Sequence, residues 1–325
     1  MLLRVAERTV ILLVSLAVSS LLVFGFMVLL PGDPARVALG VNANDELVAQ
    51  LRHEYGLDRP VVTQYLDWVG GLVRFDLGTS YISKAQIAPQ IADRLQVSLI
   101  LVAASMALAL LIAIPLGTFM AVRHQKPSGL VLSAISQIGV AVPAFLAGIL
   151  LITVFAVQLG WLPSGGWTPP AQDPRLFLTQ LVLPTLSLGL VQAAVLTRYV
   201  RSAVLDVLRE DYLRTARAKG LTPMRALVRH GLRNAAVPVV TVLGLQLATL
   251  LVGAVVIERV FFIPGLGSLL LDAVGNRDLI VVQDVVMVLV VAVLVVNFLV
   301  DLLYLVIDPR SVSYTHLTLP TNREV

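Results

Sequence analysis

The amino-acid sequence predicts an all-α membrane protein, with six transmembrane helices and a helical cap outside the membrane after the first of them. Of its 325 residues, 58% are hydrophobic and 14% are charged, whereas a soluble domain has about 25% charged residues. The mean hydropathy is +0.89. The apolar residues form long runs separated by short polar segments, which is the pattern of a polytopic membrane protein.

Six apolar runs are long enough to cross a hydrocarbon layer of roughly 30 Å, for which a helix needs about 20 residues. The first has the charged flank of a signal peptide, but its apolar run is too long and a poor cleavage site follows, so we expect it to be retained. The third is long enough to bend, and Pro143 is the expected position of a kink. The runs are 10–30, 98–122, 130–159, 181–197, 236–257 and 282–307.

Basic residues predict the orientation of these spans. With both termini inside, the interior segments hold 15 of the 24 Lys and Arg residues. Six of the exterior ones lie in the long segment 31–97, and long loops weigh little. We therefore expect a multi-pass protein of the cytoplasmic (inner) cell membrane, with both termini cytoplasmic. Trp161, Trp167 and Phe177 flank an external loop, as interfacial aromatic residues do.

The two largest polar segments are 31–97 outside and 198–235 inside. In the first, apolar residues at helical spacing before and after Pro60 predict a small helical cap. In the second, we expect one helix over 198–219, a stop at Gly220 and a restart at Thr222-Pro223. Periodicity alone allows an amphipathic helix on lipid head groups or a loop that docks a partner protein. It disfavours nucleic acid, because acidic residues interrupt the basic ones.

Several chemistries are excluded or disfavoured by residue content. Without cysteine, the chain has no disulfide, thiolate metal site or Cys nucleophile, and its four histidines are far apart. We therefore expect no catalytic residue and no metal. A phosphate-binding loop needs a Gly-Lys pair, but the three lysines, Lys84, Lys126 and Lys219, follow Ser, Gln and Ala. We expect no cofactor on this chain, so any ATP must bind another subunit.

Many fragments in order resemble one family, the permease subunits of ATP-binding-cassette (ABC) importers for oligopeptides, dipeptides and nickel, of the first-permease type. Two departures are Phe75, where the family usually has Gly, and 96–98, where Gln-Val-Ser replaces Pro-x-Thr. The fragments are 31-PGDP-34, 54-EYGLDRPVVTQYLDWV-69, 76-DLGTSY-81, 184-PTLSLGL-190, 198-RYVRSAVLDVL-208, 210-EDYLRTARAKG-220, 229-RHGLRNAAVPVVT-241, 252-VGAVVIERVFFIPGLGSLLLDAV-274, 276-NRD-278, 297-NFLVDLLY-304 and 308-DPR-310.

The resemblance implies a type I ABC importer permease fold and a non-catalytic transport subunit for oligopeptides or dipeptides. It implies four kinds of partner: a second homologous permease, two cytoplasmic ATP-binding subunits that hold the ATP, an extracytoplasmic peptide-binding protein, and membrane lipid. Nickel, glutathione or another small solute is the alternative substrate. The expected division is 1–30 (first helix), 31–97 (cap), 98–307 (permease core) and 308–325 (tail).

Other classes of protein stay open on the residues alone. A stand-alone secondary transporter would show acidic or histidine relays deep in its spans. Apart from Asp301 near one end, for which an ion-pair or capping role is expected, we expect none there. A non-transporting scaffold is the third class.

Three groups of site residues follow. By resemblance, the internal loop couples to the ATPase through Glu210, Asp211, Tyr212, Arg214, Ala216, Arg217, Ala218, Gly220 and Leu221. Polar residues within spans either line the path or bond helix to helix: Gln137, Gln192, Gln246 and Asn297. A turn and short helix starting near Ser268 form an outer gate, a binding-protein contact or a plain capping loop, with Pro264, Gly265, Gly267 and Asp272.

The last residues, 311–325, are polar, lack periodicity and fit nothing before them. They read either as a disordered tail or as residues foreign to the natural chain, and they carry no functional inference.

Overall fold

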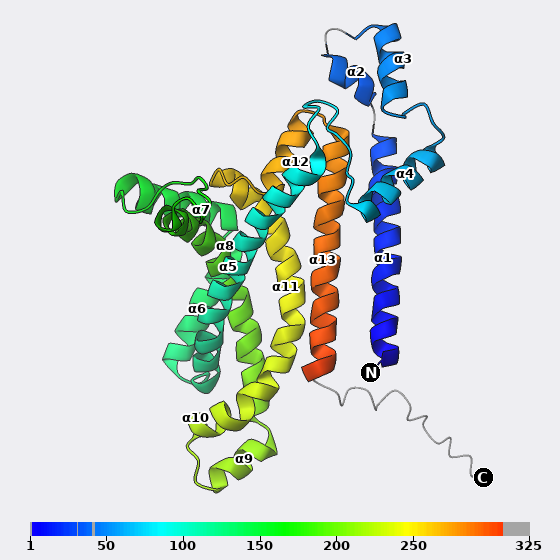
Figure 1. Ribbon diagram of the computed structural model, residues 1–325. Coiled ribbons are helices and arrows are strands. Elements are labelled where there is room, and N and C mark those ends of the chain that lie inside the picture. The colour runs from blue at the N-terminus through cyan, green and yellow to red at the C-terminus, as the bar shows by residue number, and fades with distance from the viewer. Residues whose placement is uncertain (1, 31, 41–42, 308–325) are drawn as a thin grey trace, which may run out of the picture.

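The computed structural model describes residues 2–30, 32–40 and 43–307, and it is a bundle of long helices (Figure 1). Five helices are long and apolar enough to cross a membrane, the fourth of them with a short helical lead-in that starts at Pro223. This confirms the predicted fold class and five of the six predicted spans. The five are α1 (Leu2–Leu29), α5 (Ile87–Val122), α8 (Pro174–Leu208), α11 (Leu232–Val260) and α13 (Leu279–Ile307).

The remaining span is broken into an elbow. Helix α6 (Pro127–Ala141) meets α7 (Ala144–Leu151) and the π-helix η2 (Ile152–Gln158) at an angle of 97°, and the two arms count as a sixth span if taken together. Pro143 has no N–H to continue the helix, and Val142 before it is extended (φ −83°, ψ 120°). The predicted position of the bend is confirmed, but the bend is far larger than a kink.

The core of the bundle lies where α5 and α8 pack closely together. A Cβ atom at Gly117 of α5 would lie 2.7 Å from the Cβ of Val200 and 2.8 Å from the carbonyl oxygen of Thr197, both on α8. Small residues allow this close approach, which supplies the van der Waals contact that holds helices together in lipid. Buried residues of α11, such as Leu250 and Leu251, complete the same apolar cluster.

Helix α1 stands beside α13, outside this core, and the cap lies at the end of the bundle where α1 finishes and α13 begins (Figure 1). The cap contains α2 (Pro34–Leu39), α3 (Asp45–Glu54) and α4 (Val61–Arg74). This confirms the two predicted cap helices and adds α2, which the sequence did not predict. Near the opposite end, Arg8 and Asp301 form an ion pair of 2.9 Å, which confirms the role expected for Asp301.

Two short helical elements lie at opposite ends of the bundle. The helices α9 (Asp211–Ala218) and α10 (Pro223–Ala226) lie at the end where α1 begins and α13 finishes, whereas α12 (Leu266–Gly275) lies at the end of the cap (Figure 1). The segment 308–325, including 308-DPR-310 and the final polar residues, lies outside the described residues.

Candidate functional site

The polar segment 198–235, predicted to lie inside the cell, contains a compact hairpin of short helices, α9 and α10, between α8 and α11. Gly220 joins them at φ +94°, in the left-handed region that favours glycine. Thr222 then caps α10 by accepting a hydrogen bond from the Arg225 N–H, and Pro223 occupies the first helical position. The predicted stop at Gly220 and restart at Thr222 are therefore confirmed.

The predicted single helix over 198–219 is wrong. Helix α8 ends at Leu208, and Glu210 is extended (φ −68°, ψ 140°) before α9 starts at Asp211. The break has neither glycine nor proline. We attribute it to Leu213, which is 2% exposed and can turn inward only if α9 leaves the line of α8.

Helix α9 is fixed to both of its neighbours. The Leu213 side chain packs beside Gly231 at the start of α11, where a Cβ would lie 3.4 Å from Leu213 Cδ1 and 3.0 Å from Val207 Cγ1 of α8. The side-chain amide of Asn234, on α11, donates a hydrogen bond of 2.9 Å to the Tyr212 hydroxyl. A displacement of α9 must therefore move the ends of α8 and α11.

The nine residues predicted for coupling all lie on this hairpin. Ala216 and Leu221 are partly buried against the core, and the other seven are exposed. Arg214 pairs with Asp211 within α9 at 3.2 Å, with both side chains in solvent. The hairpin thus presents a charged, small-residue surface (Asp211, Arg214, Arg217, Ala218 and Gly220) on a firmly anchored base.

The four polar residues predicted within spans do not gather at one place. Gln192 of α8 and Gln246 of α11 are buried, and the Gln192 side-chain nitrogen donates a hydrogen bond of 2.5 Å to the Gln246 oxygen. This contact is a hydrogen bond between two helices, which is the structural one of the two roles predicted for these residues. Gln137 of α6 and Asn297 of α13 are exposed. Their role in a path stays a prediction.

At the outer end, the predicted turn and short helix are α12, which starts at Leu266, two residues before the position expected. Gly265 and Gly267 are buried, Pro264 is partly buried, and Asp272 is exposed and pairs with Arg259 at 2.9 Å. A Cβ at Gly265 would lie 2.2 Å from the carboxyl carbon of Glu258. The two glycines therefore allow the chain to pack on Glu258.

Glu258 of α11 and Ser98 of α5 were not identified from the sequence. Both are buried, with Glu258 1% exposed. The Glu258 carboxylate accepts hydrogen bonds from the N–H groups of Gly267 (2.7 Å) and Ser268 (3.2 Å). Ser98 donates to the same carboxylate at 2.6 Å and accepts from the Leu266 N–H at 2.8 Å. The acidic residue in the apolar run 252-VGAVVIERVFF-262 was the available signal.

A second buried acid was also missed. Asp284 lies within the predicted span 282–307, is 0% exposed, and accepts a hydrogen bond of 2.8 Å from the Trp68 indole N–H of the cap. Its other carboxylate oxygen has no hydrogen-bond partner among the described residues. The expectation that Asp301 is the only acid within a span is therefore wrong.

Two of the resemblance fragments, 76–81 and 276–278, meet at the outer end. Asp278 is buried and accepts hydrogen bonds from the Ser80 hydroxyl and, at 3.4 Å, from the Tyr81 N–H. Tyr81 stacks on Tyr55 with ring centroids 4.0 Å apart. Burial, followed by the neighbouring Tyr55 and two aspartates, raises the pKa of Tyr81 to about 12, because the phenolate is poorly solvated there.

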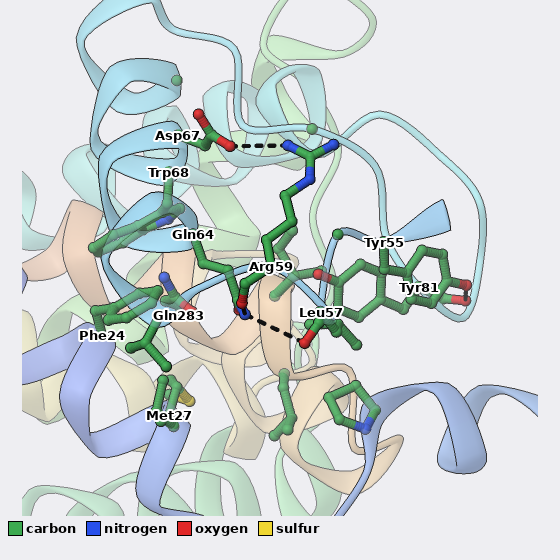
Figure 2. Close-up of a pocket in the computed structure, with 18 of the residues that line it drawn as sticks. Phe24, Met27, Tyr55, Leu57, Arg59, Gln64, Asp67, Trp68, Tyr81 and Gln283 are labelled. Carbon is green, nitrogen blue, oxygen red and sulfur yellow. Dashed lines mark hydrogen bonds and ion pairs between the residues drawn. The ribbon is translucent and has the colours of Figure 1, made fainter. Parts of the chain in front are cut away.

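A polar cavity of about 710 Å³ lies between the cap and the outer ends of α1 and α13. Figure 2 shows its wall, where Trp68 of α4 stacks on Phe24 of α1 and Gln64 donates to the Leu57 carbonyl. Arg59 and Asp67 pair at 3.0 Å across one side. Arg59 and Asp67 thus neutralise each other on this side, and the cavity is enclosed by the cap and the bundle together.

Comparison with known proteins gives a consistent result. Residues 113–313 match the family described as "Binding-protein-dependent transport system inner membrane component", and residues 1–102 match its N-terminal component. The chain is 41% identical over 306 residues to the glutathione transport system permease protein GsiC of Escherichia coli K12, covering 94% of this chain and 97% of that protein. It is 41% identical over 303 residues to GsiC of Pectobacterium atrosepticum, covering 93% and 96%.

Among solved structures, inward-facing conformations of the MetNI methionine ABC transporter match with a TM-score of 0.57 at 21% identity, covering 67% of this chain and 96% of that chain. At this identity the match shows the fold alone. Because the family match covers more than half of the chain and the relatives cover nearly all of it, the stand-alone transporter and the scaffold are set aside. The chain belongs to the binding-protein-dependent transport system inner membrane component family, as a multi-pass permease subunit of an ABC importer of type I fold.

Proposed function

We propose that this permease carries short peptides of the size of glutathione into the cell, and that ATP hydrolysis on partner subunits drives it through α9. The observation that carries the coupling step is the double anchoring of α9. Leu213 is buried between α8 and α11, and Asn234 holds Tyr212. A partner that moves α9 therefore moves two spanning helices together.

The surface of α9 suits a protein partner better than lipid head groups. Arg214 and Arg217 share it with Asp211, Glu210 and the small residue Ala218, all exposed. An acidic pair at the start of the helix disfavours an anionic membrane surface, whereas small residues and a bare glycine turn permit close seating of a groove. We place the cytoplasmic ATP-binding subunits here, with both termini on the same side of the membrane.

The remaining partners follow from the opposite end. We place an extracytoplasmic binding protein over the cap, 31–97, and over the exposed Asp272 of α12. A second homologous permease completes the path, as membership of this importer family suggests. ATP binds the partner ATPases, and this chain acts as the non-catalytic transport subunit. We propose the division into cap 31–97 and core 98–307, with the ATPase face on the core and the binding-protein face shared between the cap and α12.

The relatives support the choice of substrate class. The two described above are glutathione transport system permeases, and glutathione is itself a small peptide. Oligopeptides, dipeptides, nickel and other small solutes are the competing cargoes. Uptake of labelled glutathione into vesicles carrying the complete transporter tests the choice, with unlabelled dipeptides, longer peptides and nickel as competitors. Uptake of nickel without glutathione would overturn it.

The coupling step is tested by crosslinking, because the chain has no native cysteine. Ala218→Cys is paired with a cysteine in the docking groove of the partner ATPase, in membranes containing the whole complex. We expect a crosslink whose yield changes with ATP. Lys84→Cys, an exposed site in the loop at the opposite end, is the matched control and should give none. Absence of the Ala218 crosslink in an assembled complex would contradict docking of the ATPase on α9 and favour the alternative, in which α9 lies on the lipid head groups.

A further inference from the structure

The outer ends of α5, α11 and α13 are joined through α12 by buried polar contacts. We call Ser98, Glu258 and residues 265–278 the outer bracket. At its first turn, the N–H groups of residues 266–268 are held by Ser98 and Glu258. At its last residue, Asp278 holds Ser80 and the Tyr81 N–H, in the loop that leads into α5. The bracket is thus pinned at both ends.

The contacts of Glu258 are all of one kind. One carboxylate oxygen accepts from Ser98, and the other accepts from two backbone N–H groups. Each contact is thus a hydrogen bond that a carboxylate oxygen accepts. A buried donor or acceptor that loses its partner is costly, so these contacts oppose separation of the three elements. Removing Ser98 would detach α5 from this carboxylate but leave α11 bound to α12.

Apolar packing fills the space that these contacts enclose. Ile87 and Ile91 of α5, Leu266 and Ala273 of α12, and Val285 of α13 are buried in one cluster, separate from the main core. On the surface, Arg259 of α11 pairs with Asp272 of α12. Polar bonds, apolar packing and an ion pair therefore all oppose a displacement of α12 relative to α5 and α11.

We propose that Ser98 and Glu258 are positioning residues for transport, and that the outer bracket is a fixed pivot rather than a moving plug. Motion applied at α9 displaces the inner ends of α8 and α11. The bracket holds the outer end of α11 against α5, so motion of the inner end of α11 becomes a tilt of that helix about the bracket. Without the bracket, α11 would slide along α5 and the motion would not become a tilt. This inference rests on the proposed function, because it assumes that the partner ATPase moves α9.

The first test compares three serine variants in the complete transporter, reconstituted with its ATPases, second permease and binding protein. The readout is glutathione transported per ATP hydrolysed. Ser98→Ala leaves one Glu258 oxygen and the buried Leu266 N–H without their partner, which corresponds to a change of about tenfold in an equilibrium, and we expect the ratio to fall by about that factor. Ser98→Thr keeps the hydroxyl and should restore it.

Ser105→Ala is the matched control. Ser105 lies on the same helix and is 0% exposed, and its hydroxyl has no hydrogen-bond partner within the described part of the chain. A purely structural defect would lower the amount of assembled complex and leave the ratio unchanged. Equal ratios for Ser98→Ala, Ser105→Ala and the wild type would overturn the proposal. Failure of the wild type to transport glutathione would instead count against the proposed substrate.

A second test follows α12 directly by thiol labelling. Ala273 of α12 is 5% exposed and lies in the apolar cluster with Ile87 and Val285, so an Ala273→Cys reporter is reached by a maleimide only when α12 leaves its place. Leu271→Cys, which is 41% exposed on the same helix, is the control for access of the reagent. A pivot predicts that ATP hydrolysis leaves the labelling rate of Ala273→Cys unchanged. Faster labelling during ATP hydrolysis would show that α12 must move, and would overturn the proposal.

Discussion

Leu213→Ala should loosen α9 from the bundle. Leu213 is 2% exposed and is the residue of α9 that is fully buried. The substitution removes three carbon atoms, at about 0.8 kcal/mol each, and the cavity left behind raises the loss to about 3 kcal/mol. That loss corresponds to about a 150-fold change in the equilibrium between seated and released α9.

Thiol labelling measures this release directly. Val207 lies beneath α9 and is buried, so a Val207→Cys reporter in the cysteine-free chain is reached by a maleimide only when α9 lifts. We expect Leu213→Ala to speed labelling by up to about 150-fold, and ATP hydrolysis by the assembled complex to lose its dependence on loaded binding protein. Leu213→Met, which conserves volume, should behave nearly as the wild type.

Met224→Ala is the control for surface exposure. Met224 lies on α10 and is 48% exposed, so its truncation leaves no cavity and should change neither labelling nor coupling. If Leu213→Ala leaves the labelling of the Val207→Cys reporter unchanged, the anchoring argument is wrong. If labelling rises but coupling persists, α9 is anchored as described but does not transmit the motion.

Further predictions concern the cap, the core and the buried amides. Phe75 caps α4 at φ +58° and is 85% exposed, so Phe75→Gly should stabilise the protein by about 0.5–1 kcal/mol in a thermal unfolding assay, whereas Phe75→Ala should not. Gly117→Ala should destabilise the α5–α8 contact by about 1–3 kcal/mol. Gly25→Ala is the control and should leave the stability unchanged, because nothing lies within 4 Å of the added Cβ. Equal losses of stability in the two variants would contradict the packing argument. Gln192→Leu or Gln246→Leu alone should lower the free energy of unfolding by about 1–3 kcal/mol, because one buried amide is left unpaired. The double variant should recover most of this loss. A double variant that folds but cannot transport would instead favour a role for these residues in the path. Because the pKa of Tyr81 rises from 10.0 to about 12 on folding, the neutral phenol contributes stability that is present below pH 10 and lost as the pH rises through about 12. The chain has seven tyrosines, so the ultraviolet titration of Tyr81→Phe is subtracted from that of the wild type. The difference should be one phenolate step near pH 12, and a difference step near pH 10 would contradict the burial of the ring.

The spanning helices could be predicted from sequence because each depends only on its own apolar length. The same holds for the turn at Gly220 and the bend at Pro143, where one residue restricts its own backbone. The break at Arg209 and Glu210 could not be predicted in this way. Both residues tolerate a helix, and the chain leaves it because Leu213 gains more by packing on Val207 and Gly231 than the helix gains by continuing.

The outer site was predicted only in part for a similar reason. The glycines at 265 and 267 pointed to a close approach, but nothing local showed that the approach is made by Glu258. Asp284 and Glu258 are acids in apolar runs, which marks them as exceptional. Their partners, Trp68 and Ser98, are more than 150 residues away along the chain, so their pairing appears only in three dimensions.

The last helix also sets the order in which the chain can be completed. Helix α13 and the residue before it are bonded to three early positions, Arg8, Trp68 and Ser80, at sequence separations of 293, 216 and 198 residues. During synthesis, α1 and the cap leave the ribosome long before these partners exist. The N-terminal third of the protein is therefore inserted in the membrane without these three contacts, which form only after the final helix is inserted. A chain truncated before Leu279 should lose the attachment of its first helix as well as its last.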